Sequence, residues 1–253
     1  MEIEFLGTGT STGVPQIGCK CEVCTSADPR DNRLRTSAIV RTGGHSILID
    51  CGPDFRTQML RASSTKIDAL LLTHVHYDHA GGIDDLRPYC YPNPLPVYAK
   101  QDVFDELREH IPYCFPEHYY PGAPVFEMRV VGNEPFDCLG TTITPIEVIH
   151  HKPILGFRIG SLAYITDAKS IPVSQLPLFS GVHTLVINAL RHEPHPTHQT
   201  LEETLEIIKI AQPKQAFLLH MSHHMGLHEA VERSLPANVH LAYDQLIVSN
   251  IPD

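Results

Sequence analysis

Short apolar runs alternate along the chain with segments whose apolar residues recur every three or four positions. The short runs predict β-strands, and the wider spacing predicts amphipathic helices. In the segment Leu201–Ala211, for example, Leu205 and Ile208 would lie on one side of a helix. Thr200 and Glu203 have the spacing of an N-terminal capping box, which supports a helix beginning there.

Twelve predicted strands and six predicted helices follow from this pattern. The predicted strands are Ile3–Gly7, Ser37–Arg41, Ser46–Asp50, Ala69–Thr73, Pro96–Ala99, Val125–Val131, Thr142–Ile149, Gly156–Ile159, Leu162–Thr166, His183–Asn188, Gln215–Leu219 and Leu246–Ser249. The predicted helices are Asp54–Ala62, Ile83–Tyr91, Gln101–His110, Pro172–Leu178, Leu201–Ala211 and Leu227–Ser234. This mixture predicts a layered α/β fold, and the lack of a Pro/Ser-rich linker predicts one domain over residues 1–253.

Composition narrows the class of protein. The chain has 253 residues, of which 42% are hydrophobic and 19% are charged, as in folded globular proteins. A formal net charge of −10 disfavours unaided binding to the phosphate backbone of nucleic acids. The sequence contains no basic leader with an apolar core and no apolar stretch of membrane-spanning length. Three of its seven cysteines lie within six residues, which favours metal binding in a reducing cytoplasm over a disulfide framework.

The most informative motif directly follows the predicted strand Ala69–Thr73. Within six residues it contains His74, His76, Asp78 and His79. Imidazole and carboxylate ligands suit Zn, Mn or Fe, and burying four such groups without a metal would be costly. The alternative is a polar loop in which the histidines occur by chance.

Three further ligand candidates, His150, Asp167 and His220, each follow a predicted strand. Strand ends are where α/β sheets place ligand sites, so these side chains could converge with the first motif. Taken singly, each would more often be a hydrogen-bonded structural residue. As a set, they predict one metal centre.

The motif His-x-His-x-Asp-His, followed by a lone His, a lone Asp and a late His, resembles the metallo-β-lactamase superfamily of hydrolases. This resemblance implies a four-layer αββα sandwich of two mixed sheets, with a dinuclear metal site at one edge. The di-iron oxygen-reducing relatives have Glu where this chain has His76, which favours hydrolysis over redox chemistry. By resemblance, the first metal is held by His74, His76 and His150, the second by Asp78, His79 and His220, and Asp167 bridges both.

A cysteine loop at about residues 14–31 suggests a second type of site. Cys19, Cys21 and Cys24 form a short thiol cluster, and thiolates select Zn. The alternative is free loop cysteines. No fourth ligand is near in sequence, and His223 and His224 are the best remote choices. By resemblance to the phosphodiesterases of the carbon–phosphorus lyase pathway, the fourth ligand of this structural zinc is His223.

Hydrolysis of a phosphate ester also needs a proton for the departing alkoxide. By resemblance to these phosphodiesterases and to tRNA 3′-processing enzymes, His198 assists the leaving group. His192 and His195 could bind substrate phosphate or be solvated loop residues. With His198, the residues expected to be catalytic are Asp78 and Asp167.

Three remaining features give less specific predictions. Asp50 could orient a ligand histidine, or it could be a turn-forming residue before Gly52. The glycine-rich segment Gly7–Gly13 lacks the spacing of a nucleotide-binding loop, and we interpret it as a flexible turn near the metal site. Ile111–Pro124 is rich in proline and aromatic residues, which fits either a surface excursion or a wall of the substrate pocket.

These observations predict a cytoplasmic dinuclear-metal phosphodiesterase acting on a small phosphorylated sugar or nucleotide-like substrate. By resemblance, that substrate is 5-phosphoribosyl 1,2-cyclic phosphate, opened to ribose 1,5-bisphosphate. The expected cofactors are two catalytic metals, Mn or Zn with Fe as a further option, and one structural Zn. Binding to membranes is not expected, nucleic acid is disfavoured as a partner, and resembled relatives are often homodimers.

Three alternatives remain open. A tRNA 3′-processing endonuclease would share the metal motif, but this chain has no basic, Gly/Pro-rich arm. A lactone or thioester hydrolase would usually add a C-terminal helical domain, for which Met221–Asp253 is too short. The last alternative is a non-catalytic zinc-binding module, in which the metals serve only stability.

Overall fold

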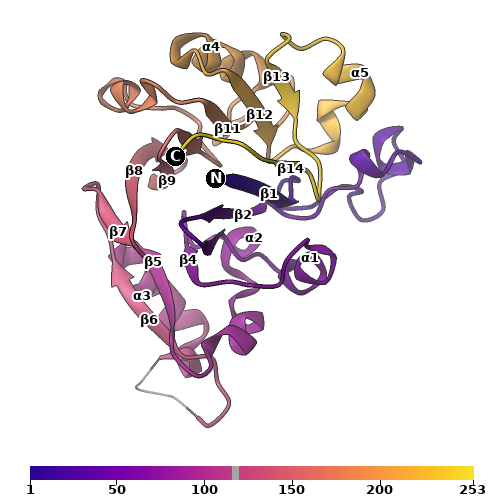
Figure 1. Cartoon of the computed structure of the whole chain (residues 1–253). Helices are drawn as coiled ribbons and strands as arrows, with labels where there is room; N and C mark the ends of the chain where they lie inside the picture. Colours follow the sequence, from indigo (N-terminus) through magenta and orange to yellow (C-terminus); the bar gives the residue numbers. More distant parts are fainter. Residues whose placement is uncertain (116–119) are drawn as a thin grey trace.

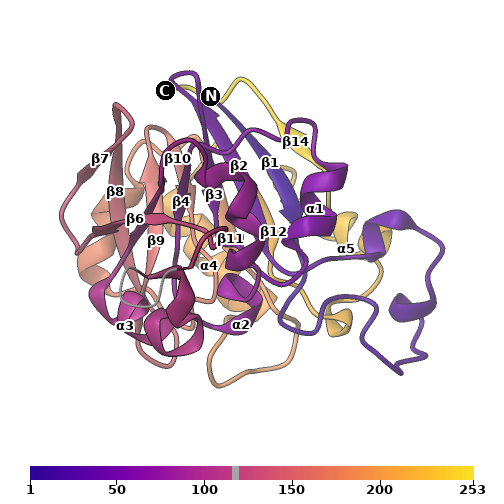
Figure 2. The same ribbon diagram turned by 90° about the horizontal axis from the view of Figure 1, so that it is seen from below.

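The computed structural model describes residues 1–115 and 120–253. Two β-sheets face each other, and helices cover their outer faces (Figures 1 and 2). The strands are β1 (Glu2–Gly7), β2 (Ser37–Thr42), β3 (His45–Ile49), β4 (Ala69–Leu71), β5 (Leu95–Ala99), β6 (Phe126–Val130), β7 (Phe136–Cys138), β8 (Thr141–Ile149), β9 (Pro153–Ile159), β10 (Leu162–Tyr164), β11 (Thr184–Asn188), β12 (Gln215–Leu219), β13 (Val239–Leu241) and β14 (Ile247–Val248). The first seven-stranded sheet has the order β14-β1-β2-β3-β4-β5-β6, and the second has the order β13-β12-β11-β10-β9-β8-β7.

The helices divide between the two outer faces. The α-helices are α1 (Phe55–Arg61), α2 (Tyr77–Ala80), α3 (Gln101–His110), α4 (Leu201–Ala211) and α5 (His228–Glu232). The 3-10 helices are η1 (Val23–Thr25), η2 (Pro29–Asp31), η3 (Ile83–Cys90), η4 (Pro112–Cys114), η6 (Val173–Phe179) and η7 (His223–Met225). Buried side chains of α1, η3 and α3 pack on the first sheet, and those of α4 and α5 pack on the second. Within the described ranges, no helix combines the length and apolarity needed to cross a membrane.

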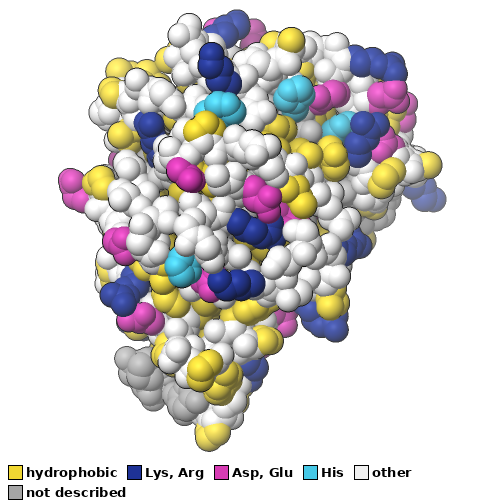
Figure 3. Space-filling model, in the orientation of Figure 1, with side chains coloured by type: hydrophobic (Ala, Val, Ile, Leu, Met, Phe, Trp, Pro, Cys, Tyr) yellow, Lys and Arg dark blue, Asp and Glu magenta, His cyan; other side chains and the backbone are white. Residues whose placement is uncertain are grey.

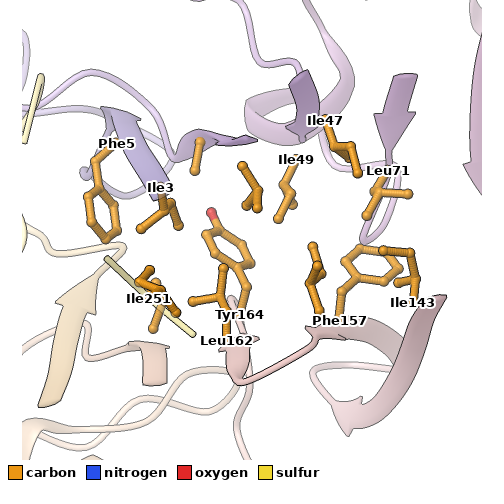
Figure 4. Packing of buried hydrophobic residues seen from close by; sticks show 14 of the residues in the cluster. Ile3, Phe5, Ile47, Ile49, Leu71, Ile143, Phe157, Leu162, Tyr164 and Ile251 are labelled. Carbon is orange, nitrogen blue, oxygen red and sulfur yellow. The ribbon is translucent and has the colours of Figure 1, made fainter. Parts of the chain in front are cut away.

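Three apolar clusters explain the layering. Successive side chains of a strand point to opposite faces, so Ile47 and Ile49 enter the central cluster while Leu48 enters the outer one. The central cluster joins both sheets through residues such as Phe157 and Tyr164 (Figure 4). Each outer cluster fills the space between one sheet and its helices. The predicted αββα sandwich with two mixed sheets is therefore confirmed.

The local predictions were less complete. Ile83–Tyr91 and Pro172–Leu178 were predicted as α-helices, but both segments form 3-10 helices that contain a proline, which removes an amide donor. The pattern missed β7, β13 and α2, which are only three or four residues long. The capping box of α4 is present, with reciprocal bonds of 3.1 and 2.8 Å between Thr200 and Glu203.

Candidate metal centre

Strand ends from both sheets converge on one cluster of side chains that could bind a metal. The His74–His79 motif follows β4, His150 follows β8, and His220 follows β12. Asp167 lies three residues beyond β10. Within each of the following groups, the possible ligand atoms lie within 4.8 Å of one another: His74, His76 and His150; Asp78, His79, Asp167 and His220; His150, Asp167 and His198.

The same backbone conformation occurs after three strands, β3, β10 and β12. Asp50, Asp167 and His220 have φ angles of 60°, 58° and 58°, which place them in the left-handed region. Residues other than glycine seldom adopt this conformation, although Asn, Asp and His do so more often than most, and such residues cluster at functional sites. The sequence suggested a turn at Asp50, before Gly52, but gave no signal at Asp167 or His220.

Buried hydrogen bonds orient the histidines of the motif. The carboxylate of Asp50 accepts a bond from Nδ1–H of His79 at 2.7 Å, and it also accepts the backbone N–H and hydroxyl of Thr73. The Thr73 hydroxyl in turn lies 2.9 Å from Nδ1 of His74. Because their Nδ1 atoms have these partners, His79 and His74 turn Nε2 toward the other candidate ligands. Nε2 of His74 lies 3.1 Å from Nδ1 of His76.

The two remote histidines are oriented in the same way. Nδ1–H of His150 donates to the carbonyl of Thr197 at 2.8 Å, and Nδ1 of His220 lies 3.1 Å from the hydroxyl of Thr36. Sequence reasoning missed Thr36, Thr73 and Thr197 because isolated threonines carry no motif. Their positions emerge only when the strands are assembled.

The donor set fits a bound metal. Nε2 of His79 is buried and has no hydrogen-bond partner among the described residues. It lies 3.3 Å from a carboxylate oxygen of Asp78 and 3.2 Å from one of Asp167. A ring nitrogen and two carboxylates so arranged, without hydrogen bonds between them, are the donors that divalent metals bind.

The surroundings shift the pKa values of the histidine donors in opposite directions. Burial lowers the pKa of His74 well below its ordinary value and that of His220 to about 4, so both rings are neutral and able to coordinate. Burial also acts on His79, but Asp167, Asp78 and Asp50 outweigh it and raise its pKa well above the ordinary value. A protonated His79 would have to lose its Nε2 proton before it could serve as a metal ligand.

His198 lies against the cluster rather than far from it. Its Nε2 is 2.9 Å from Oδ1 of Asp167, and its side chain is 12% exposed, so it can reach the centre and solvent alike. His195 contacts His198, whereas Nε2 of His192 lies 2.9 Å from the carbonyl of Met225. Of the three histidines in this loop, His198 is thus the one adjacent to the carboxylate of Asp167.

The cysteine loop forms a separate cluster. Cys19, Cys21, Cys24 and His223 bring their ligand atoms within 4.8 Å of one another. Nδ1 of His223 lies 3.6 Å from Sγ of Cys19 and 3.2 Å from Sγ of Cys21. The backbone N–H of Cys24 and then His223 lower the pKa of Cys21 to about 6, which favours the thiolate that zinc prefers.

Two less specific expectations can also be placed. The Gly7–Gly13 segment borders the metal cluster, since the Thr10 hydroxyl lies 3.1 Å from Nε2 of His220. In the Ile111–Pro124 segment, residues 116–119 lie outside the described part of the chain. Ile111 and Tyr113 line a cavity of about 420 Å³ together with Tyr77, which lies between two residues of the motif.

Comparison with known proteins now identifies the family. Residues 45–221 match the family model described as a beta-lactamase superfamily domain, so the chain belongs to this superfamily. A solved structure described as a new diphosphatase from the PhnP family is 41% identical. It superposes with a TM-score of 0.91, covering 98% of this chain and 97% of that one. The fold and family define a metal-dependent hydrolase of the metallo-β-lactamase type that resembles PhnP.

Two relatives by sequence carry different names. An octanoyltransferase from Porphyromonas gingivalis is 43% identical over 250 residues, covering 97% of this chain but 51% of that protein. This chain therefore spans about half of that relative, whose name describes the longer protein. A ribonuclease Z from Mycobacterium avium is 26% identical over 219 residues, covering 76% of this chain and 71% of that protein.

Proposed function

We propose that this protein hydrolyses a small phosphodiester at a dinuclear metal centre. The observation that carries the proposal is the placement of Asp167, whose carboxylate is grouped both with the second-metal ligands and with His150 of the first. Such a carboxylate can bridge two ions. In this proposal the first metal is held by His74, His76 and His150, and the second by Asp78, His79 and His220.

The donor types and the bond that orients His79 both suit such a centre. The imidazole and carboxylate donors suit Mn or Zn, with Fe as a further option. When bound, a pair of such ions polarises the phosphoryl oxygens and lowers the pKa of a water held between them. Asp50 keeps His79 in its coordinating orientation through their 2.7 Å hydrogen bond.

His198 supplies the proton for the leaving group in this proposal. Its Nε2 lies 2.9 Å from Asp167, beside the position where a substrate phosphate would bind. Cleavage of the phosphorus–oxygen bond leaves an alkoxide, which takes the Nε2 proton as the bond breaks. General acid catalysis of this type contributes about 10²- to 10⁴-fold.

Two classes of substrate are candidates for this centre. The first is 5-phosphoribosyl 1,2-cyclic phosphate, whose opening would give ribose 1,5-bisphosphate. The second is a diphosphate diester, a class supported by the 41% identical relative described as a diphosphatase. Its phosphoanhydride bond would release a phosphate group rather than an alkoxide, so this substrate would depend less on the proton from His198. Long nucleic acids are less suited, because the chain carries a formal charge of −10. On the face drawn in Figure 3, basic and acidic side chains are also interspersed.

The decisive experiment measures turnover of Mn- and Zn-loaded protein on four substrates. These are 5-phosphoribosyl 1,2-cyclic phosphate, 2′,3′-cyclic AMP, a dinucleoside diphosphate and a precursor tRNA. Phosphorus NMR identifies which bond breaks. Preference for the ribosyl cyclic phosphate would support the first candidate, and preference for the dinucleoside diphosphate would support the second. Cleavage of the tRNA alone, or of none of the four by metal-replete protein, would refute the proposal.

The cysteine cluster has a different proposed role. We infer that Cys19, Cys21, Cys24 and His223 hold one structural zinc, because three thiols and one imidazole can close a tetrahedron. None of these four residues belongs to the groups around Asp167 that would hold the two catalytic metals, which together form the dinuclear cluster. Its zinc content can be measured independently of turnover.

A further inference from the structure

The loop between β11 and α4 is fixed to the strand end that carries Asp167. The side chain of Asn188 both donates to and accepts from the backbone of Ala168, at 2.9 and 2.8 Å. At the other end of the loop, the backbone N–H of Gln199 donates to the same Ala168 carbonyl at 3.0 Å. Side chains in this loop are therefore held at fixed positions relative to the metal-binding carboxylate.

His198 uses its two ring nitrogens differently. Nε2 faces Asp167 at 2.9 Å, as described above. Nδ1 points back into the loop, where it lies 3.1 Å from Nδ1 of His195 and 3.0 Å from the hydroxyl of Thr197. The two imidazoles are tilted by 58° with their centroids 5.0 Å apart, so their contact is edge-on between nitrogens rather than stacked.

The protonation pattern follows from the neighbours of His195. The backbone N–H of Thr197 donates to Nδ1 of His195 at 3.4 Å, so this nitrogen presents a lone pair. Burial and the nearby His198 and Arg191 lower the pKa of His195, which favours a neutral ring. The Thr197 hydroxyl lies near both Nδ1 atoms, 3.3 Å from that of His195 and 3.0 Å from that of His198, and it can donate or accept. With Nδ1 of His195 as an acceptor, a direct hydrogen bond between the two rings takes its hydrogen from His198.

We propose that His195 is a positioning residue, whose Nδ1 accepts a hydrogen bond from Nδ1–H of His198. This contact fixes the ring and leaves Nε2 as the nitrogen that delivers the proton. The step starts from His198 as the imidazolium, with a hydrogen on each nitrogen. The leaving oxygen takes the Nε2 hydrogen, so this N–H bond breaks as an O–H bond forms, and the neutral ring keeps Nδ1–H toward His195. The inference rests on the proposed hydrolysis, but the tautomer of His198 can be observed without any turnover.

The kinetic test compares leaving groups. An alkoxide needs the proton from His198, as in 2′,3′-cyclic AMP, whereas 4-nitrophenolate from bis(4-nitrophenyl) phosphate departs without one. We expect His195→Ala to lower kcat by roughly 10- to 100-fold on the cyclic nucleotide, a loss typical for partners that orient a functional side chain. On the aryl diester kcat should change by no more than about twofold. Metal content should stay at the wild-type value.

Two variants make this test specific. His195→Asn keeps an acceptor where Nδ1 of His195 lies, and it should restore most of the lost rate. His192→Asn changes another histidine of the same loop that contacts a backbone carbonyl rather than His198, and it should leave both substrates unaffected. Equal losses on both substrates after His195→Ala, or no rescue by His195→Asn, would overturn the proposal.

Nitrogen NMR of Zn-loaded, histidine-labelled protein gives the independent readout. Long-range proton–nitrogen correlations should report His198 with a protonated Nδ1, and this signature should change in His195→Ala but not in His192→Asn. An unprotonated Nδ1 in the wild type would refute the positioning role even if phosphodiesters are cleaved. Conversely, a protonated Nδ1 in protein that cleaves no phosphate ester would refute only the proposed function.

Discussion

The dinuclear cluster and the cysteine cluster differ in how the fold holds their candidate ligands. In the dinuclear cluster, His74, His79, Asp167 and His220 are each no more than 1% exposed, and they come from both sheets. The cysteine cluster is partly exposed and lies on a loop at one edge of the molecule, beside the segment that precedes α5 (Figure 2). One site is built into the framework, whereas the other is attached to it.

The difference has an energetic consequence. Ligands of the dinuclear cluster are held by their own hydrogen bonds, as Asp50 holds His79 and Thr36 holds His220. The cysteine loop is held by local turns, by His223, and by the backbone N–H of His228, which donates to Asp31 at 2.7 Å. We therefore expect the dinuclear cluster to govern activity and the cysteine cluster to govern the stability of the loop.

The largest effect should come from Asp167→Asn. Asparagine tolerates the left-handed backbone at this position, so the change removes charge rather than local structure. With its shared carboxylate lost, we expect kcat/KM to fall at least about 10³-fold, or ~4 kcal/mol. Metal analysis should show reduced occupancy of the dinuclear site. Asp105→Asn, on the exposed face of α3, is the matched control, and wild-type activity in Asp167→Asn would contradict the shared-ligand role.

A ligand of the cysteine cluster should affect stability instead. In Cys21→Ser we expect loss of one zinc per chain and a lower free energy of unfolding, since metal loss is among the largest single-residue effects. We expect the melting temperature to fall by roughly 5 to 10 °C. Glu22→Gln, in the same loop, should retain both zinc and stability. An unchanged zinc content in Cys21→Ser would show that this cluster does not hold the ion.

The cysteine region should also be sensitive to acid. Beneath the loop, a guanidinium nitrogen of Arg33 lies 3.1 Å from Nδ1 of His228. Burial and then Arg33 lower the pKa of His228 to about 4. The unfolded chain therefore binds more protons between pH 6.5 and 4, so the free energy of unfolding falls as the pH falls through this window.

His228→Asn tests this sensitivity. Asparagine retains an acceptor for Arg33 but cannot gain a proton, so it should remove about 2 kcal/mol of the stability difference between pH 7 and pH 4.5. Denaturant unfolding of wild type and variant at pH 7 and pH 4.5 measures the difference. Parallel stability curves for the two proteins would mean that His228 already shares its protonation state with the unfolded chain.

The sequence alone revealed the candidate metal ligands but not the residues and turns that orient them. The spacing in His74–His79 marks a metal motif because its ligands are contiguous, and residues at strand ends follow the apolar runs. Thr36 and the left-handed turns at Asp167 and His220 depend on how separate strands meet, which no local pattern encodes. The same limit applies to β7 and β13, since three-residue strands are defined by their partners.

The smallest effect should come from Tyr164, in the core beneath the dinuclear cluster. Its hydroxyl points toward the strands of the first sheet (Figure 4) and has no hydrogen-bond partner among the described residues. Burial raises its pKa well above the ordinary value, and so do Asp50 and Asp167. Because an unpaired buried hydroxyl is unfavourable, Tyr164→Phe should leave stability unchanged or raise it by up to about 1 kcal/mol.

Activity and metal content of Tyr164→Phe should match the wild type, as measured by turnover and by metal analysis of the loaded protein. Phe157→Leu, a change of similar depth in the same cluster, should instead lower stability because it leaves a cavity. A fall in turnover with unchanged folding in Tyr164→Phe would show that the hydroxyl acts on the carboxylates above it. The framework beneath the dinuclear cluster would then belong to the site itself, which would widen the contrast with the attached cysteine loop.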